Sequence, residues 1–440
     1  MDDPSMYDVK RLGKCTIDAM EVLPSIEKGS LVTFAEDSTR VVLDARVRPG
    51  DGDRGPAASF EIGGPRRLLY FDPSKLRAGI VTCGGICPGL NNVIRGIVMK
   101  LWHRYGVRRI AGVRYGLRGF VPSYRLPLVD LDPERVASIH HVGGSILGSS
   151  RGHQDPGAIV DAMDRQDMDV VFFVGGDGTL RAAHLVAQEV ERRNVRAAIV
   201  GVPKTIDNDI MFVEKSFGLD TAVSIAAETL RAAHAEATGA PSGIVVVKLM
   251  GRQSGYIAAR AALATQDVNL VLVPEQRFEL DGPAGLLALL RRRFERSDHM
   301  VVVVAEGAGQ DLLGRAGAEE RDPSGNLKLG DIGEFLCRRI REAFASWGRE
   351  ITLRYIDPSY IIRAAPAIAA DGIYCAELAE MAVHAAMAGR TDMVVGSACG
   401  RITHVPLALA TSGRKTIDLE GPLWRSVLEA TGQPASLVNG

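Results

Sequence analysis

The chain has 440 residues, of which 46% are hydrophobic and 24% are charged, enough for two or three domains with large buried cores. The net charge of -1 gives no overall field that would favour nucleic acid or an anionic membrane as a partner. No stretch offers the roughly 20 uninterrupted apolar residues of a membrane span, and the beginning of the chain lacks the features of a secretory signal. The six cysteines form no disulfide framework, so the sequence predicts a cytoplasmic protein. Cys83 and Cys87 have no second Cys or His pair near them in the sequence, which argues against a zinc site.

Residues 1–75 contain short alternating apolar runs and predict a small β-containing extension. From Ala78 onward, apolar runs, glycine turns and helical patterns alternate, which is typical of βαβ units. The predicted strands are 78–82, 109–113, 170–174 and 196–200, then a second set at 243–248, 269–273 and 300–304. Helices are predicted at 91–105, 221–237, 331–347 and 371–388, and exposed loops at 48–53 and 315–330.

The two sets of strands predict an α/β fold with two Rossmann-like lobes, whose mainly parallel sheets are covered by helices. Ligands of open α/β sheets bind beyond the carboxyl ends of the strands. Polar and glycine residues follow nearly every predicted strand at that end. We therefore expect one composite active site in the cleft between the lobes.

The most prominent of these strand ends is Gly175-Gly176-Asp177-Gly178-Thr179, which follows the apolar run 170–174. Glycines let backbone N–H groups approach a bound anion, and a carboxylate there suits a phosphate-bound Mg²⁺. Taken alone, the motif also fits a tight turn with a solvated acid. Gly84-Gly85 could cradle phosphates in the same way, although its surroundings match neither the dinucleotide fingerprint nor the P-loop.

A second motif, Thr205-Ile206-Asp207-Asn208-Asp209, places two carboxylates two residues apart in an irregular segment. A kinase needs one carboxylate to accept the proton of the attacking hydroxyl group and another group to hold Mg²⁺. Asp207 is the candidate base, Asp177 the metal ligand and Asp209 a supporting acid. The alternative is a solvated turn or a helix cap.

Three basic residues lie in or near strand-end turns, where they could neutralise charge on a transferred phosphoryl group. They are Lys204, Arg252 and Arg151. Each of them alone could equally be a solvated surface charge, but together they favour an anionic substrate.

Taken together, Gly-Gly-Asp-Gly-Thr, Pro-Lys-Thr-Ile-Asp-Asn-Asp, Met-Gly-Arg-Gln-Ser-Gly and Pro-Glu resemble the 6-phosphofructokinase family, from about Tyr70 to about Gly400. The first motif is shared with NAD kinases and lipid kinases, whereas the second and third are specific at this spacing. The resemblance implies a glycolytic, Mg²⁺-dependent enzyme. It would transfer the γ-phosphoryl group of ATP to the C1 hydroxyl of fructose 6-phosphate as a homo-oligomer, a dimer or a tetramer.

The resemblance also implies the roles of individual residues. Asp207, Lys204 and Arg252 would be catalytic, and Asp177 would bind Mg²⁺. The nucleotide would be bound by Gly85, Arg151, Gly176, Asp177, Gly178 and Thr179. The sugar phosphate would be bound by Thr205, Asp207, Asp209, Met250, Gly251, Arg252, Glu275, Arg354, Tyr360 and Arg363.

The domain boundaries follow from the same resemblance. The extension would span 1–75 and the nucleotide-binding lobe 76–217 plus 362–398. The sugar-phosphate-binding lobe and the C-terminal tail would comprise 218–361 plus 399–440.

The phosphoryl donor depends on two residues. Pyrophosphate-dependent members typically carry a second Asp where this chain has Gly178, and an Asp there would crowd the α-phosphate of a nucleotide. Lys204, however, is the residue that those enzymes carry. Together the two resemble the plant and trypanosome ATP-dependent branch, so ATP is predicted.

Several alternatives stay open. They are a pyrophosphate-dependent phosphofructokinase, an NAD-type or lipid-type kinase, and a non-catalytic subunit that binds sugar phosphate. Leu117 replaces an aromatic residue near the adenine, which leaves the choice of base open. Arg95 matches an effector-binding arginine of bacterial members, so allosteric control is predicted, although a plain surface position on a helix is equally compatible.

Overall fold

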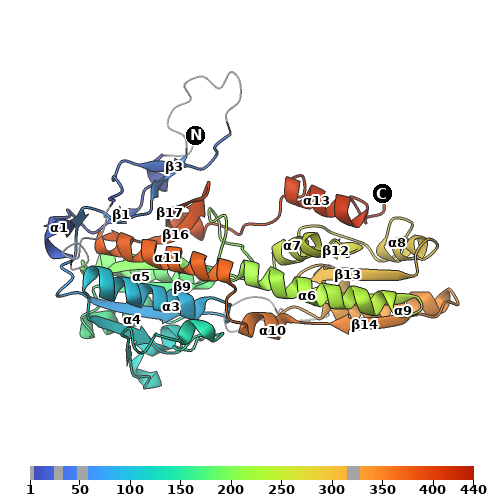
Figure 1. The fold of residues 1–440 in the computed structure, drawn as a ribbon, viewed down its shortest axis with the longest axis horizontal. Helices are drawn as coiled ribbons and strands as arrows, with labels where there is room; N and C mark the ends of the chain where they lie inside the picture. Colours follow the sequence, from blue (N-terminus) through green and yellow to red (C-terminus); the bar gives the residue numbers. More distant parts are fainter. Residues whose placement is uncertain (1–3, 24–32, 47–57, 315–327) are drawn as a thin grey trace. The chain divides into compact units, whose positions relative to one another are not determined.

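The computed structural model describes residues 4–23, 33–46, 58–314 and 328–440 (Figure 1). The chain divides into two compact units, each described by itself below. The first comprises Met1–Thr205, Ile210–Gly218 and Ala364–Arg414, and the second Ile206–Asp209, Leu219–Arg363 and Lys415–Gly440. The predicted loop at 48–53 and residues 315–327 of the loop predicted at 315–330 lie outside the described residues.

Within its described residues, the first unit is built on a nine-stranded sheet in the order β3-β4-β17-β16-β10-β9-β6-β7-β8. Its parallel strands are β6 (Arg77–Thr82), β7 (Arg109–Val113), β9 (Val170–Gly175), β10 (Ala198–Pro203) and β16 (Met393–Ala398). The antiparallel strands are β3 (Arg40–Val42), β4 (Ser59–Ile62), β17 (Arg401–Pro406) and β8 (Val129–Asp130). Every residue of β9 and β10 is buried, as expected for parallel strands covered on both faces.

Two pairs of helices cover this sheet. Helix α4 (Pro156–Arg165) packs with α5 (Asp177–Arg192), and their apolar faces join side chains of β6, β7 and β9 in one core. Helix α3 (Leu90–Met99) continues as a π-helix over Lys100–Tyr105, which together match the helix predicted at 91–105, and packs against α11 (Ala369–Met387).

The second unit contains a parallel sheet that, in the described residues, has the order β12-β13-β11-β14. Its strands are β11 (Gly243–Leu249), β12 (Leu270–Leu272), β13 (His299–Ala305) and β14 (Thr352–Ile356). Successive side chains of a strand point to opposite faces. Val245 and Val247 accordingly join α6 (Leu219–Thr238), α7 (Tyr256–Thr265) and α13 (Pro422–Thr431), while Ile244 and Val246 join α8 (Leu286–Arg293) and α9 (Ile332–Ser346). The predicted α/β class with two mainly parallel sheets is confirmed.

The predicted boundary at residue 399 is wrong, because Arg401–Pro406 forms β17, which pairs with β16 of the first unit. The extension is not a separate body either, since β4 and β3 continue the same sheet beyond β17. Glu61 on β4 accepts hydrogen bonds from Arg390 (2.6 Å) and Arg66 (2.9 Å), and all three residues are buried. A buried charge is tolerated only when it is paired. The ion pairs of Glu61 therefore hold the N-terminal extension within the first unit.

The remaining short helices and strands are α1 (Ala19–Val22), α10 (Ser359–Ala364), α12 (Leu407–Ala410), β1 (Lys10–Arg11), β2 (Ile17–Asp18), β5 (Leu68–Leu69) and β15 (Arg390–Thr391). None of the helices in the described ranges combines the length and the apolar character needed to cross a membrane.

Candidate active site

Three neighbouring strands of the first unit carry predicted site residues at their carboxyl ends. The strands lie in the order β10-β9-β6, and they are followed by Lys204, by Gly176–Thr179 and by Gly84–Gly85, respectively. Because the three strands are parallel, these ends meet at one edge of the sheet, where open α/β sheets bind ligands. The structure thus brings together residues that lie up to 120 positions apart, and we call them the first-unit cluster.

The Gly-Gly-Asp-Gly-Thr motif is not a free turn but the start of helix α5. Gly176 is the N-cap, and Asp177, Gly178 and Thr179 form the first turn. The first backbone N–H groups of a helix have no partner within the helix, and they attract anions. A Cβ atom at Gly175 would lie 2.2 Å from Oγ1 of Thr179, so only glycine fits there. A Cβ atom at Gly178 would meet no atom within 4 Å. Packing therefore does not require glycine at this position, and its lack of a side chain leaves open space.

Asp177 is held by two arginines that the sequence analysis did not identify. Its carboxylate accepts hydrogen bonds from Nε of Arg181 at 3.0 and 3.1 Å and from Arg414 at 3.3 Å. The side chain of Asp177 is only 10% exposed. The four-residue spacing on a helix could have revealed Arg181, whereas Arg414 lies 237 positions away and no local signal points to it.

Lys204 lies in the first-unit cluster, next to the turn at Gly84–Gly85. Its buried ammonium group donates to the carbonyl of Gly85 at 2.8 Å. Gly84 has φ +86, and a Cβ atom there would lie 3.1 Å from that ammonium nitrogen. The hydroxyl of Ser149 donates to the Gly84 carbonyl at 2.6 Å, which fixes the loop that carries the exposed Arg151.

No described group of three or more His, Cys, Asp or Glu side chains could hold a metal by itself. Cys83 and Cys87 are buried, and burial raises the pKa of the Cys83 thiol to about 12.

A second group of predicted site residues belongs to the second unit and centres on Asp207. The backbone N–H of Arg252 donates to a carboxylate oxygen of Asp207 at 3.4 Å, and the hydroxyl of Ser254 donates to the Asp207 carbonyl at 2.6 Å. Burial, followed by the negative charges of Asp209 and Glu306, raises the pKa of Asp207 to about 7, while the Arg252 N–H and Arg363 act in the opposite direction. A carboxyl group whose pKa lies near neutrality is suited to general base catalysis at physiological pH.

Other predicted residues are gathered around Asp207. Nε of Arg363 lies 3.2 Å from Sδ of Met250. Gly251 has φ +131, and a Cβ atom there would lie 2.4 Å from the Ser254 carbonyl oxygen, so glycine is required. Asp209 is buried, and its carbonyl accepts the N–H of Lys415 at 2.9 Å. Asp207, Asp209, Met250–Arg252 and Arg363 form what we call the second-unit cluster.

The remaining predicted sugar-phosphate residues, Glu275, Arg354, Tyr360 and Thr205, do not belong to the second-unit cluster. The carboxylate of Glu275 accepts the N–H groups of Gly255 (3.0 Å) and Ile417 (2.8 Å), so it holds backbone segments together. Arg354 is exposed on β14, and Tyr360 at the start of α10 is 80% exposed. Thr205 follows Lys204, and its carbonyl accepts the hydroxyl of Ser216.

Glu306 acts electrostatically on Asp207 of the second-unit cluster, and the sequence analysis left it unassigned. It follows β13, and its N–H donates to the Leu249 carbonyl at 2.8 Å, which places it beside the end of β11. The rule that ligands bind at the carboxyl ends of parallel strands could have identified it.

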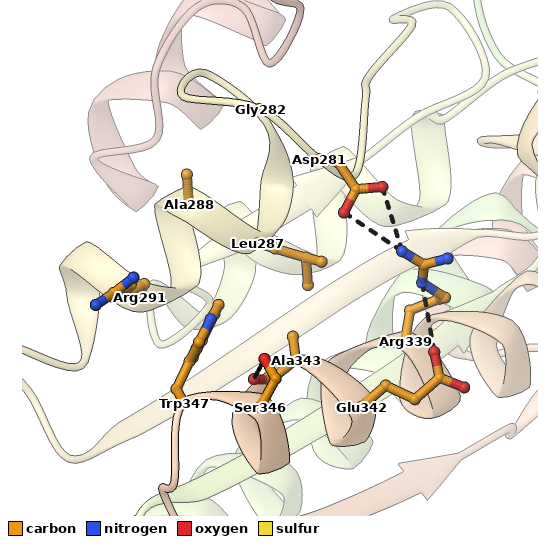
Figure 2. Close-up of a pocket in the computed structure, with 10 residues that line it drawn as sticks. All are labelled: Asp281, Gly282, Leu287, Ala288, Arg291, Arg339, Glu342, Ala343, Ser346 and Trp347. Atoms are coloured by element: carbon orange, nitrogen blue, oxygen red, sulfur yellow. Dashed lines mark hydrogen bonds and ion pairs between the residues drawn. The ribbon is translucent and has the colours of Figure 1, made fainter.

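A surface groove of about 420 Å³ lies between α8 and α9 of the second unit (Figure 2). It is lined by Leu287, Ala343 and Trp347, with Arg339 within 3.2 Å of the carboxylate of Asp281. None of the predicted site residues lines it, so it is distinct from both clusters.

The fold and the two clusters define the class of this protein as an α/β enzyme of phosphoryl transfer. The family described as Phosphofructokinase matches residues 77–386. The chain belongs to the phosphofructokinase family.

Relatives resemble the chain over nearly its full length. The ATP-dependent 6-phosphofructokinase of Borreliella burgdorferi is 45% identical over 98% of this chain and 98% of its own length. The enzyme of that name from Amycolatopsis methanolica is 48% identical over 97% of this chain and 95% of its own length. The one from Trypanosoma brucei brucei is 44% identical over 93% of this chain and 84% of its own length. A pyrophosphate-dependent phosphofructokinase from Marinobacter aquaeolei has the same fold, with a TM-score of 0.66 over 81% of this chain and 91% of that one at 20% identity.

Proposed function

We propose that this chain is an ATP-dependent 6-phosphofructokinase, which transfers the γ-phosphoryl group of ATP to the C1 hydroxyl of fructose 6-phosphate. Relatives of that name are 44–48% identical to it over most of its length. The observation that carries the proposal is the carboxyl group of Asp207, whose raised pKa and contact with the Arg252 backbone suit a base for an attacking hydroxyl.

In this proposal Asp207 accepts the C1 proton as the hydroxyl oxygen attacks the γ-phosphorus atom. Arg252 and Lys204 offset the negative charge that develops on the transferred group. The sugar phosphate is bound by Thr205, Asp209, Met250, Gly251, Glu275, Arg354, Tyr360 and Arg363. The nucleotide phosphates are bound by Gly85, Arg151, Gly176, Gly178 and Thr179.

Asp177 is the proposed ligand of Mg²⁺. Magnesium is usually held by one or two carboxylates together with substrate phosphates and water, and a single, largely buried carboxylate at a helix N-terminus fits that pattern. When bound, the ion would offset phosphate charge. Arg181 and Arg414 keep the carboxylate oriented through their hydrogen bonds to it.

The open space beside Gly178 favours ATP as the donor, because no side chain blocks the position assigned to the α-phosphate. The test is a coupled assay of the purified protein with fructose 6-phosphate, run with ATP and, separately, with pyrophosphate. Turnover with pyrophosphate alone would make the chain a pyrophosphate-dependent enzyme. A homo-oligomeric state, a cytoplasmic location and effector binding at Arg95 stay predictions of the sequence.

The raised pKa of Asp207 predicts an acidic limb in the pH profile. The base must be ionised, so kcat/KM should fall about tenfold per pH unit below the Asp207 pKa of about 7. Substrate phosphates also titrate near pH 6, so the assignment needs a variant. Glu306→Gln removes a negative charge that raises the pKa of Asp207 and should move the limb to lower pH, whereas exposed Glu342→Gln should leave it in place. A limb that does not move in Glu306→Gln would assign it to the substrates.

Lys204 supports a further expectation. Lys204→Met keeps most of the unbranched side chain but removes its charge, and kcat with ATP should fall about 100-fold because one electrostatic contact to the developing charge is lost. The matched control is Lys75→Met, which removes an exposed lysine of the same unit. Equal kcat values for the two variants would exclude Lys204 from catalysis.

A further inference from the structure

A charged residue interrupts the apolar strand β11. Lys248 lies between Val247 and Leu249, and its side chain is 13% exposed. Burial of lysine is costly unless the ammonium group is paired. Its Nζ atom lies 2.6 Å from Asp331 and 3.0 Å from Asp357.

Each of the two carboxylates also starts a helix. Asp331 accepts the N–H of Glu334 at 3.0 Å as the N-cap of α9, and the hydroxyl of Tyr355 donates to it at 2.9 Å. Asp357 accepts the N–H of Ser359 at 3.0 Å and the Ser359 hydroxyl, which fixes the first turn of α10. Lys248 therefore links one strand to the starting points of two helices.

Helix α10 leads directly to the second-unit cluster. It carries Tyr360 and Arg363, and Arg363 approaches Met250, which lies only two positions beyond Lys248. The chain thus forms a closed path from Lys248 through Asp357 and α10 to Arg363, and back to the end of β11.

We propose that Lys248 is a positioning residue for the sugar-phosphate side of the site: its ion pair with Asp357 fixes where α10 begins and thereby places Arg363. The inference rests on the proposed function, in which Arg363 binds the sugar phosphate. Lys248 itself does not touch the substrate in this scheme. Loss of the pair should therefore weaken binding of fructose 6-phosphate and leave use of ATP intact.

The experiment compares Lys248→Met, Lys248→Arg and Asp357→Asn in the full chain. Asparagine still accepts the Ser359 N–H, so Asp357→Asn removes the ion pair while keeping the cap. Lys248→Met and Asp357→Asn should each raise KM for fructose 6-phosphate about tenfold, with kcat and KM for ATP within about twofold. Lys248→Arg should recover most of the loss. Lys248→Met combined with Asp357→Asn should be no worse than Lys248→Met alone, because that single variant already removes the contact with Asp357.

Arg277→Met, which removes an exposed ion pair of the same unit, is the matched control and should leave all constants unchanged. Thermal unfolding of every variant monitors folding, and Asp357→Asn carries the test if Lys248→Met does not fold. Three results would each overturn the inference. They are an unchanged KM for fructose 6-phosphate, a fall of kcat together with a rise of the KM for ATP, and additive effects in the double variant. A wild-type protein inactive towards fructose 6-phosphate would instead overturn the proposed function.

Discussion

Asp207→Asn is expected to lower kcat with ATP and fructose 6-phosphate by about 10³-fold or more, because an amide cannot accept the C1 proton. The amide oxygen can still accept the backbone N–H of Arg252, which contacts the carboxylate at 3.4 Å, so the local structure should persist. KM for fructose 6-phosphate should change little. Steady-state kinetics together with binding of the sugar phosphate measure the two effects separately.

The matched control is Asp298→Asn in the same unit, where the carboxylate is 87% exposed. It should retain wild-type kcat. If Asp207→Asn kept more than a tenth of the wild-type kcat, the base would have to be another group. Glu306 would then be the first candidate, because its charge acts directly on Asp207.

Gly178→Asp is expected to lower kcat/KM for ATP by about 100-fold or more. A Cβ atom at this position meets no atom within 4 Å, so the new side chain fits without displacing its neighbours. A carboxylate in the first turn of α5 is also compatible with the helix dipole. Its charge, however, would lie where the nucleotide phosphates are proposed to bind, and like charges repel strongly at short range.

Gly178→Ala separates bulk from charge, and it should lose much less activity than Gly178→Asp. Both variants are assayed with ATP and with pyrophosphate, and their unfolding temperatures should stay close to that of the wild type. If Gly178→Asp used ATP as well as the wild type does, the residue at position 178 would not determine the use of ATP. A selective gain with pyrophosphate would show that this position decides between donors.

Local patterns in the sequence predicted the regular elements that bear the site. The run 170–174 gave a strand buried on both faces, because five consecutive apolar residues are stable only when both faces of a sheet are covered. The glycine and acidic residues that follow it were placed correctly at the carboxyl end of the strand. Their conformation was not predicted, because Asp177 begins helix α5 instead of lying in a turn. Gly176 is the N-cap of this helix, and the sequence therefore lacks the Ser, Thr, Asp or Asn that usually marks a helix start.

Where the sequence patterns were too short, only the tertiary structure decided. Strand β3 has three residues and β4 has four, too few for a reliable alternation, and they are defined by pairing with each other and with β17. The boundary predicted at residue 399 failed for a different reason: β17 belongs to the first unit through its pairing with β16, and its six residues do not show by themselves which sheet they join.

The chemistry divides along the same line. By itself the sequence determined the family and the strand ends, and it proposed Asp177 and Asp207 as site residues, because these inferences depend on motifs of a few adjacent residues. Only the tertiary structure showed which groups interact: Arg414 with Asp177, Lys248 with Asp357, and the charge of Glu306 with Asp207. The partners in these pairs lie about 100 positions apart or more, and interactions over such separations are set by how the strands and helices pack, which no local pattern encodes.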